Sequence, residues 1–239
     1  MSSEAVWQEV EYGSYAADLA VWERLVASHG APVLELGCGC GRVALHLARQ
    51  GHEVWAVDDN ERLVTGLAEQ AAVERLALRA ICADVGAMKL DHAFPLAIAP
   101  MQLMQVLGGR EKRAAALRRV ASHLGSGGAL AAAVVDAGTI DGAVPLPLPD
   151  VRELDGWVYS SLPVATEVKG DRLEVRRIRQ TVSPDGSLAE ADHTECLDLL
   201  DAGALEDEAA AAGFRAAGRL AIPAKDGYVG STVVIVERR

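Results

Sequence analysis

The fold is decided by the stretch Val33-Leu34-Glu35-Leu36-Gly37-Cys38-Gly39-Cys40-Gly41-Arg42. It begins with a short apolar run of the kind found in a buried strand. The alternate glycines that follow let the backbone turn sharply and approach a ligand without side-chain interference. A helix from Arg42 to about Gln50 would then present free amide groups and a positive dipole end to a carboxylate or phosphate. The stretch therefore predicts a strand, a ligand-binding turn and a helix.

Strand-like and helix-like segments alternate on both sides of this turn. Before it, residues 15–28 have apolar residues at helical spacing, and Gly30 ends the segment. After it come four strand-like runs and two helical segments, at 54–57, 78–82, 96–99 and 129–135 and at 61–75 and 110–123. This alternation indicates βαβ units and a parallel sheet. We therefore expect an α/β fold with a doubly wound, Rossmann-like, mostly parallel seven-stranded sheet.

The sequence changes character after Asp136. Residues 143–150 are rich in proline, and alternating strand-like runs joined by turn signals continue to about residue 200. We interpret this part as an antiparallel β insertion after the fifth strand, packed over one edge or mouth of the sheet. A helix at 204–212 and strands at 214–222 and 229–236 would close the fold.

The chain of 239 residues fits one domain. We expect four parts within it: an N-terminal helical cover (1–32), a ligand-binding core (33–136), the β insertion as a substrate cap (143–200), and a closing helix with two strands (201–239).

The charge balance argues against a nucleic-acid partner. Against 34 Asp and Glu the chain has 23 Lys and Arg, a formal net charge of −11. Nucleic-acid affinity comes largely from counterion release by basic residues, so such a chain repels polyphosphate backbones.

Membrane and metal partners are not expected either. No apolar run approaches the ~20 residues of a membrane helix, and the N-terminus lacks a signal-peptide pattern. The four cysteines have neither the spacing of a zinc site nor the density of a disulfide scaffold. We expect a cytoplasmic monomer or homodimer with reduced thiols and no metal.

Two acids extend the ligand site beyond the glycine turn. Asp58 ends the second predicted strand, where its carboxylate can accept hydrogen bonds from both hydroxyls of a ribose. It could instead cap the next helix, as could Asp59 or Asn60. Asp84 ends the third strand, where it can face an adenine amino group or be a solvated loop acid. All these features fall on the carboxyl edge of the sheet, where doubly wound folds bind ligands.

Residues 33–48 resemble motif I of class I S-adenosylmethionine-dependent methyltransferases, in the form typical of their small-molecule branch. The likeness continues through residues 51–58, 83–84, 98–101 and 211–214. Residues 12–18 are similar to an N-terminal segment that closes over the cofactor in many relatives. The resemblance implies transfer of a methyl group from S-adenosylmethionine to an O or N atom of a small-molecule acceptor.

The resemblance also implies a role for each matching residue. The methionine part of the cofactor would be held by Glu35, Gly37, Cys38, Gly39 and Gly41. The ribose would be held by Asp58, with Asp59 beside it, and the adenine by Asp84 and Val85. The rest of the cofactor wall would be Ala99, Pro100, Met101, Gln105 and, from above, Tyr15. The sequence departs from the family at Cys40, where Thr or Ser is common, and at Pro95, where Asp is usual.

The acceptor side gives weaker signals. A sulfonium donor is already activated, so positioning supplies much of the acceleration, and a base is needed only if the acceptor must lose a proton. His193 is the candidate base, or else a histidine on a surface hairpin. Tyr12, Trp157 and Tyr159 are candidates for the acceptor wall, and the last two could equally be core residues.

Two other functions compete with methyl transfer. A nicotinamide-dependent oxidoreductase would need the fingerprint G-x-G-x-x-G/A, which Arg42 breaks when it is counted from Gly37. Counted from Gly39, Ala44 satisfies it, but Gly41 and Arg42 then crowd the turn. A non-catalytic cofactor-binding or scaffold protein is the other alternative.

Overall fold

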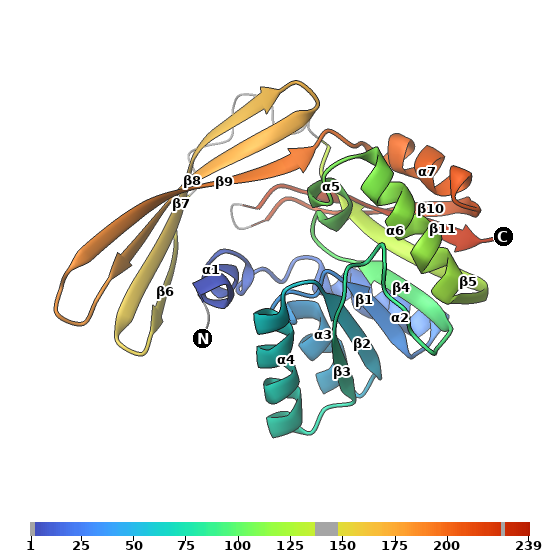
Figure 1. Cartoon of the computed structure of the whole chain (residues 1–239), viewed down its shortest axis with the longest axis horizontal. Coiled ribbons are helices and arrows are strands. Elements are labelled where there is room, and N and C mark those ends of the chain that lie inside the picture. The colour runs from blue at the N-terminus through green and yellow to red at the C-terminus, as the bar shows by residue number, and fades with distance from the viewer. Residues whose placement is uncertain (1–2, 137–147, 226–227) are drawn as a thin grey trace.

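The computed structural model describes residues 3–136, 148–225 and 228–239. Two sheets make up its framework, one of seven strands and one of four (Figure 1). None of the helices in these ranges is long and apolar enough to cross a membrane.

The seven-stranded sheet has the order β10-β11-β5-β4-β1-β2-β3. Its strands are β1 (Val33–Leu36), β2 (Val54–Asp58), β3 (Leu78–Cys82), β4 (Phe94–Ala99), β5 (Leu124–Val134), β10 (Phe214–Ile222) and β11 (Ser231–Arg238). The neighbouring strands β3, β2, β1, β4 and β5 pair in parallel. Strand β11 runs antiparallel to both of its neighbours, β5 and β10. The expected mostly parallel α/β sheet is confirmed. Its order reverses between β1 and β4, the switch point beyond which such sheets bind ligands.

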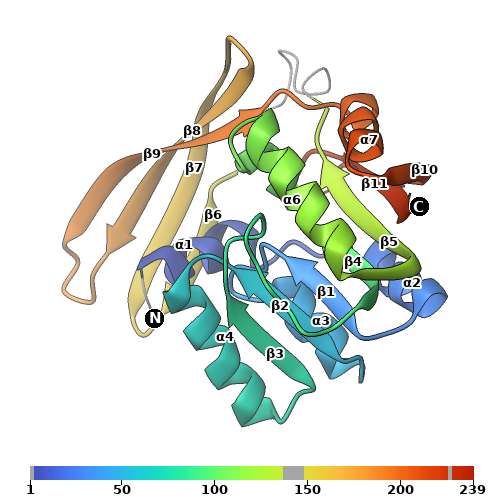
Figure 2. The same ribbon diagram turned by 45° about the vertical axis from the view of Figure 1, so that its right-hand side comes forward.

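Helices cover both faces of this sheet because its buried strands are apolar on both sides. Val33 packs on one face with α2 (Leu19–His29), α3 (Arg42–Arg49) and Leu67 of α4 (Glu61–Glu74). Leu34, the next residue along β1, packs on the other face with α5 (Leu103–Val106), α6 (Arg110–His123) and α7 (Ala202–Ala211). Figure 2 shows α6 lying across the front of the sheet.

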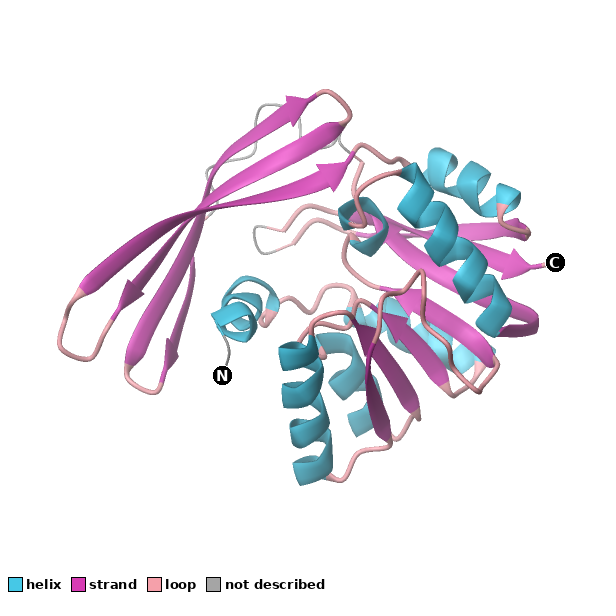
Figure 3. Cartoon of the chain, in the orientation of Figure 1, coloured by secondary structure: helices cyan, strands magenta, loops and turns pink. Residues whose placement is uncertain are grey.

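The second sheet is the expected insertion after β5. Its four antiparallel strands follow one another in the order β6 (Asp150–Leu154), β7 (Trp157–Lys169), β8 (Arg172–Val182) and β9 (Leu188–Asp198). It extends to one side of the larger sheet, and Figure 3 shows α1 (Ser3–Tyr12) as the helix beside it. Residue 143, where the sequence places the start of the insertion, lies outside the described residues.

The N-terminal cover differs from the sequence expectation. The sequence predicts one helix at 15–28, but the structure has two helices here. The first, α1, ends at Tyr12, and α2 starts only at Leu19. Asp18 occupies the N-cap position of α2 but does not cap the helix. Its carboxylate instead accepts hydrogen bonds from Arg42 and from Trp22 Nε1.

A buried ionic cluster fixes the point where the insertion rejoins the core. Arg113 of α6 donates through Nε and Nη2 to the carboxylate of Glu208 on α7, each at 2.8 Å. Its Nη1 donates to Asp198 at the end of β9. All three side chains are about nine-tenths buried. The cluster therefore joins β9 to two helices of the core.

Replacement of Arg113 by alanine should lower the free energy of unfolding by about 3–5 kcal/mol, because it leaves the buried Glu208 without its cation and Asp198 with only the half-exposed Arg172, 3.6 Å away. Urea unfolding followed by circular dichroism measures this change. Arg118→Ala, at an exposed position of the same helix, should change it by less than about 0.5 kcal/mol. Equal effects of the two substitutions would show that the cluster does not stabilise the fold.

Candidate active site

A cleft of about 1490 Å³ lies at the carboxyl ends of β1, β2 and β3 and beside the loop after β4. The glycine turn, the start of α4 and the helix α1 form much of its wall, and Leu154 and Glu195 reach it from the second sheet. Its volume exceeds the ~300–1,000 Å³ of an ordinary small-molecule pocket. The cleft therefore has room for a cofactor and a second small molecule.

The conformation of the glycine turn favours glycine at its three alternate positions. Gly37, Gly39 and Gly41 have φ values of 64°, 54° and 85°. A Cβ atom at these positions would collide with Leu103, Gln8 and Leu67 respectively. The turn thus lies against side chains from three other segments, and Gly37 and Gly39 line the cleft. Gly41, also expected at the cofactor, is not in the described wall, because its α-carbon faces Leu67 of α4.

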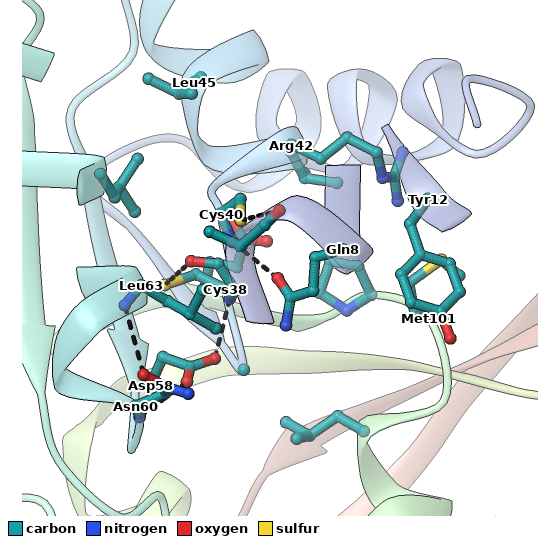
Figure 4. Close-up of a pocket in the computed structure, with 18 of the residues that line it drawn as sticks. Gln8, Tyr12, Cys38, Cys40, Arg42, Leu45, Asp58, Asn60, Leu63 and Met101 are labelled. Carbon is teal, nitrogen blue, oxygen red and sulfur yellow. Dashed lines mark hydrogen bonds between the residues drawn. The ribbon is translucent and has the colours of Figure 1, made fainter. Parts of the chain in front are cut away.

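Asp58 ties this turn to the next loop of the sheet. Its Oδ2 accepts a hydrogen bond from Gly39 N at 2.8 Å, and its Oδ1 accepts one from Asn60 N at 3.0 Å (Figure 4). Asn60, not Asp58, caps α4, because its side chain accepts from Arg62 N and Leu63 N. Asp58 therefore keeps its carboxylate in the cleft wall.

Glu35 provides a buried acid in the same wall. Its side chain is 2% exposed, and its Oε2 atom has no hydrogen-bond partner. Burial raises the pKa of Glu35 to about 8, and the nearby Arg42 charge opposes that rise. The group is therefore mostly protonated near neutral pH, and a cation that enters the cleft would favour its ionised form and pair with it.

Arg42 does not obstruct the turn. Its guanidinium donates to both carboxylate oxygens of Asp18, at 2.6 and 2.7 Å, and to the carbonyl oxygen of Tyr15 at 2.8 Å. It also lies over the Tyr15 ring, 5.0 Å from its centre. Burial raises the pKa of Tyr15 to about 12. Arg42 thereby fastens the N-terminal cover, including Tyr15 in the cleft wall, to the start of α3.

The helix α1 contributes a contact that the sequence interpretation missed. Gln8 Oε1 accepts a hydrogen bond from Cys40 N at 2.9 Å, and Figure 4 shows the Gln8 side chain directed at the glycine turn. In the sequence, Val6 and Val10 are four positions apart, which is a spacing typical of one face of a helix, and both are buried in the structure. This spacing could have indicated α1.

The other expected cofactor residues divide into two groups. The cleft wall includes Cys38, Asp59, Asp84, Val85, Pro100 and Met101. The expectation for Ala99 and Gln105 differs from the structure, since neither is in the described wall. Ala99 is fully buried in the core, and Gln105 uses its amide to bond Val135 N and O at 2.8 and 3.0 Å.

The expected acceptor residues are also only partly in the cleft. Tyr12 lines it and donates its hydroxyl hydrogen to Glu195 Oε2 at 3.0 Å, and burial raises the Tyr12 pKa well above its usual value. Three expected residues lie outside the described wall, namely His193, Trp157 and Tyr159.

Each of these three has another environment. His193 lies within β9 opposite Arg177, and burial, followed by the Arg179 charge, lowers its pKa. Trp157 is 40% exposed, and Tyr159 packs edge-on against Trp7 with ring centres 5.7 Å apart. Sequence reasoning missed Glu195, because its place in the wall depends on how the second sheet sits beside α1.

Comparison with known families agrees with this geometry. Residues 33–128 match the family model described as "Methyltransferase domain". The match spans the glycine turn, Asp58 and Asp84, and it confirms the resemblance to class I methyltransferases. This segment of the chain is a methyltransferase domain.

Two curated relatives match part of the chain. Hemagglutinin 1 of Eikenella corrodens is 31% identical over 100 residues, which are 42% of this chain and 33% of that protein. The probable S-adenosyl-L-methionine-dependent methyltransferase TehB of Haemophilus influenzae is 30% identical over 117 residues, 49% of this chain and 39% of TehB. The chain thus spans well under half the length of either relative.

Solved structures share the whole fold. The sugar N-methyltransferase KedS8 from Streptoalloteichus sp ATCC 53650 has a TM-score of 0.80 at 18% identity, with 100% of this chain and 93% of that chain covered. The CcbJ methyltransferase from Streptomyces caelestis has a TM-score of 0.73 at 22% identity, with 95% and 94% covered. At these identities the likeness concerns the fold, including the second sheet.

Gly41 of the glycine turn and Gly66 of α4 give a matched test of the turn. Gly41→Ala should lower the free energy of unfolding by about 1–3 kcal/mol, because it combines a left-handed φ with a collision against Leu67. Gly66→Ala, within α4 and with no atom near its added Cβ, should raise it by about 0.5–1 kcal/mol. Urea unfolding of both variants measures the difference. A stabilising Gly41→Ala would contradict the described turn.

Proposed function

We propose that this protein transfers a methyl group from S-adenosylmethionine to an O or N atom of a small molecule bound in the cleft. The observation that carries this proposal is the grouping of the glycine turn, Glu35 and Asp58 in one wall, within the matched methyltransferase domain. The net charge of −11 favours a small molecule over a nucleic acid as acceptor. We place the protein in the cytoplasm, as a monomer or homodimer.

The residues in the cleft fit the cofactor. The unpartnered Glu35 Oε2 suits the ammonium of the methionine part, and the glycine turn leaves room for its chain. Asp58 would accept hydrogen bonds from the ribose, and Asp84 and Val85 would flank the adenine. S-Adenosylmethionine supplies a methyl group on a positively charged sulfur, which is an activated leaving group. The chain's own residues then have to bind it, exclude water and orient the acceptor.

Binding and turnover of labelled S-adenosylmethionine test this function. We expect calorimetry to show binding of S-adenosylmethionine and no competing binding of NAD. Preference for NAD would favour the oxidoreductase alternative. Binding of S-adenosylmethionine with no release of S-adenosylhomocysteine on any acceptor would favour the non-catalytic alternative.

Asp58→Ala should weaken binding of S-adenosylhomocysteine by about 1–3 kcal/mol, because a charged hydrogen-bond acceptor for the ribose is lost. Calorimetry with S-adenosylhomocysteine and with methylthioadenosine, which keeps the ribose, should show the loss for both ligands. Glu69→Ala removes the same charge from an exposed position of the cleft wall and should leave both affinities unchanged. An unaltered affinity in the Asp58 variant would refute the ribose assignment.

Cofactor binding near neutral pH should release close to one proton. The ligand-free Glu35 carboxyl, with a pKa of about 8, is mostly protonated there, and a bound ammonium would stabilise its charged form. The release should disappear above about pH 9, where the carboxyl is already ionised. Calorimetry in buffers of different ionisation enthalpy counts the protons.

Two controls make this proton count specific. Glu35→Gln should bind S-adenosylhomocysteine without proton release, and methylthioadenosine, which lacks the ammonium, should release none from the unaltered protein. A release that persists in the Glu35 variant would assign the proton to another group.

A further inference from the structure

The inner face of the second sheet, which packs against α1, holds several charged residues. Glu11 of α1 is 2% exposed and accepts two hydrogen bonds from Arg179, both at 2.8 Å. Ser161 donates a third, at 2.7 Å. These contacts and the Arg179 charge hold the Glu11 pKa below its ordinary value despite burial, which raises it. Glu11 is thus a fully compensated carboxylate.

The neighbouring acids are compensated in the same way. Asp150 Oδ2 lies 3.1 Å from Arg177 Nη1, and Glu9 Oε1 lies 3.6 Å from Arg152 Nη2. Glu195 differs from them, because its partner is the neutral phenol of Tyr12 and it forms no ion pair within the described ranges of the chain. Glu195 is also the acid from the second sheet that reaches the cleft wall.

The cations of the cleft wall do not compensate this acid. Arg42, Arg49 and Arg62 are paired with acids outside the wall. Those acids are Asp18 at 2.6 Å, Glu74 at 2.7 Å and Glu4 at 3.9 Å. Lys112 is also in the wall, on the α6 side, without an ion pair among the described residues.

The acids of the wall outnumber these cations. They include Asp58, Asp59 and Asp84 on the cofactor side and Glu195 on the opposite side. Such a cleft attracts cations and repels phosphate or carboxylate groups.

From this charge distribution we infer that the acceptor is a small-molecule amine without phosphate or carboxylate groups, whose nitrogen binds beside the carboxylate of Glu195 in the cleft wall. The inference rests on the proposed methyl transfer and names its substrate class. Glu195 forms an ion pair with the ammonium form of the amine, and Tyr12 holds the carboxylate in place through its hydroxyl.

The same carboxylate favours the transfer step. The amine first loses a proton to water, so that its lone pair can form the new bond between nitrogen and the methyl carbon. The bond from that carbon to sulfur breaks, and its electron pair stays on sulfur. Positive charge therefore moves from sulfur to nitrogen, toward Glu195, which stabilises the charge as it develops. The methylated ammonium then returns to solution or loses a proton to water.

Matched sets of acceptors test the substrate class. The amines are glucosamine, putrescine and tyramine, their anionic counterparts are glucosamine phosphate, gamma-aminobutyrate and tyrosine, and their hydroxyl counterparts are glucose, butanediol and tyrosol. The rate of S-adenosylhomocysteine release by the protein is measured at saturating S-adenosylmethionine. With at least one of the amines this rate should be at least ~10-fold higher than with either of its counterparts.

The outcomes separate this inference from the function on which it rests. Preference for an anionic or hydroxyl compound, or no preference by a protein that binds S-adenosylmethionine, would overturn the amine assignment alone. A protein that does not bind S-adenosylmethionine would overturn the proposed function and this inference with it.

A charge-matched pair of variants tests the role of Glu195. Glu195→Gln should lower kcat/KM for the preferred amine at least ~10-fold. The ratio of kcat/KM for this amine to kcat/KM for its anionic counterpart should also fall. The Kd for S-adenosylmethionine should stay within about twofold of its original value. Glu190→Gln removes the same charge from the opposite face of β9, where Glu190 is exposed and bonds Gln180. Glu190→Gln should leave kcat/KM for the amine, its ratio to that of the anionic counterpart, and the Kd for S-adenosylmethionine unchanged. An unchanged selectivity in folded Glu195→Gln would contradict the inference, and Tyr12→Phe should give a smaller loss of the same kind.

Discussion

The hydrogen bond from Gly39 N to Asp58 Oδ2 is the contact on which the arrangement of the cleft depends. Leu36 and Val57 are register partners in parallel strands, so the chain leaves β1 and β2 at the same level of the sheet. The glycine turn can then fold back toward Asp58, and the bond fixes the separation of the two loops. A bond between an amide and a charged carboxylate contributes about 1.5–3 kcal/mol, enough to favour one loop geometry over others.

The helix α1 gives the cleft its second side. One face of this short helix contacts the glycine turn through Gln8, and another contacts the second sheet through Glu11 and Trp7. The sheet that holds the adenosyl-binding residues and the sheet that carries Glu195 are therefore connected through ten residues of helix. Any movement of α1 would change both sides of the cleft at once.

Local patterns were sufficient to predict most of the fold. The apolar runs at 78–82 and 214–222 and the helical segment at 110–123 coincide with β3, β10 and α6. The glycines and strand-end acids were also recognisable, because their positions follow from strand ends alone. Contacts between distant segments were not predictable. Gln105 was expected in the cleft from its sequence position, but its side-chain amide is hydrogen-bonded to Val135, just after β5. Glu195 is part of the cleft wall only because the second sheet lies beside the cleft.

A crystal structure of the complex with S-adenosylhomocysteine tests the central claim most directly. The account predicts the ribose hydroxyls within hydrogen-bonding distance of the Asp58 carboxylate, the ammonium beside Glu35, and the sulfur facing the part of the cleft that Tyr12 and Glu195 line. A ligand bound elsewhere on the protein, or in this cleft with its ribose away from Asp58, would contradict it.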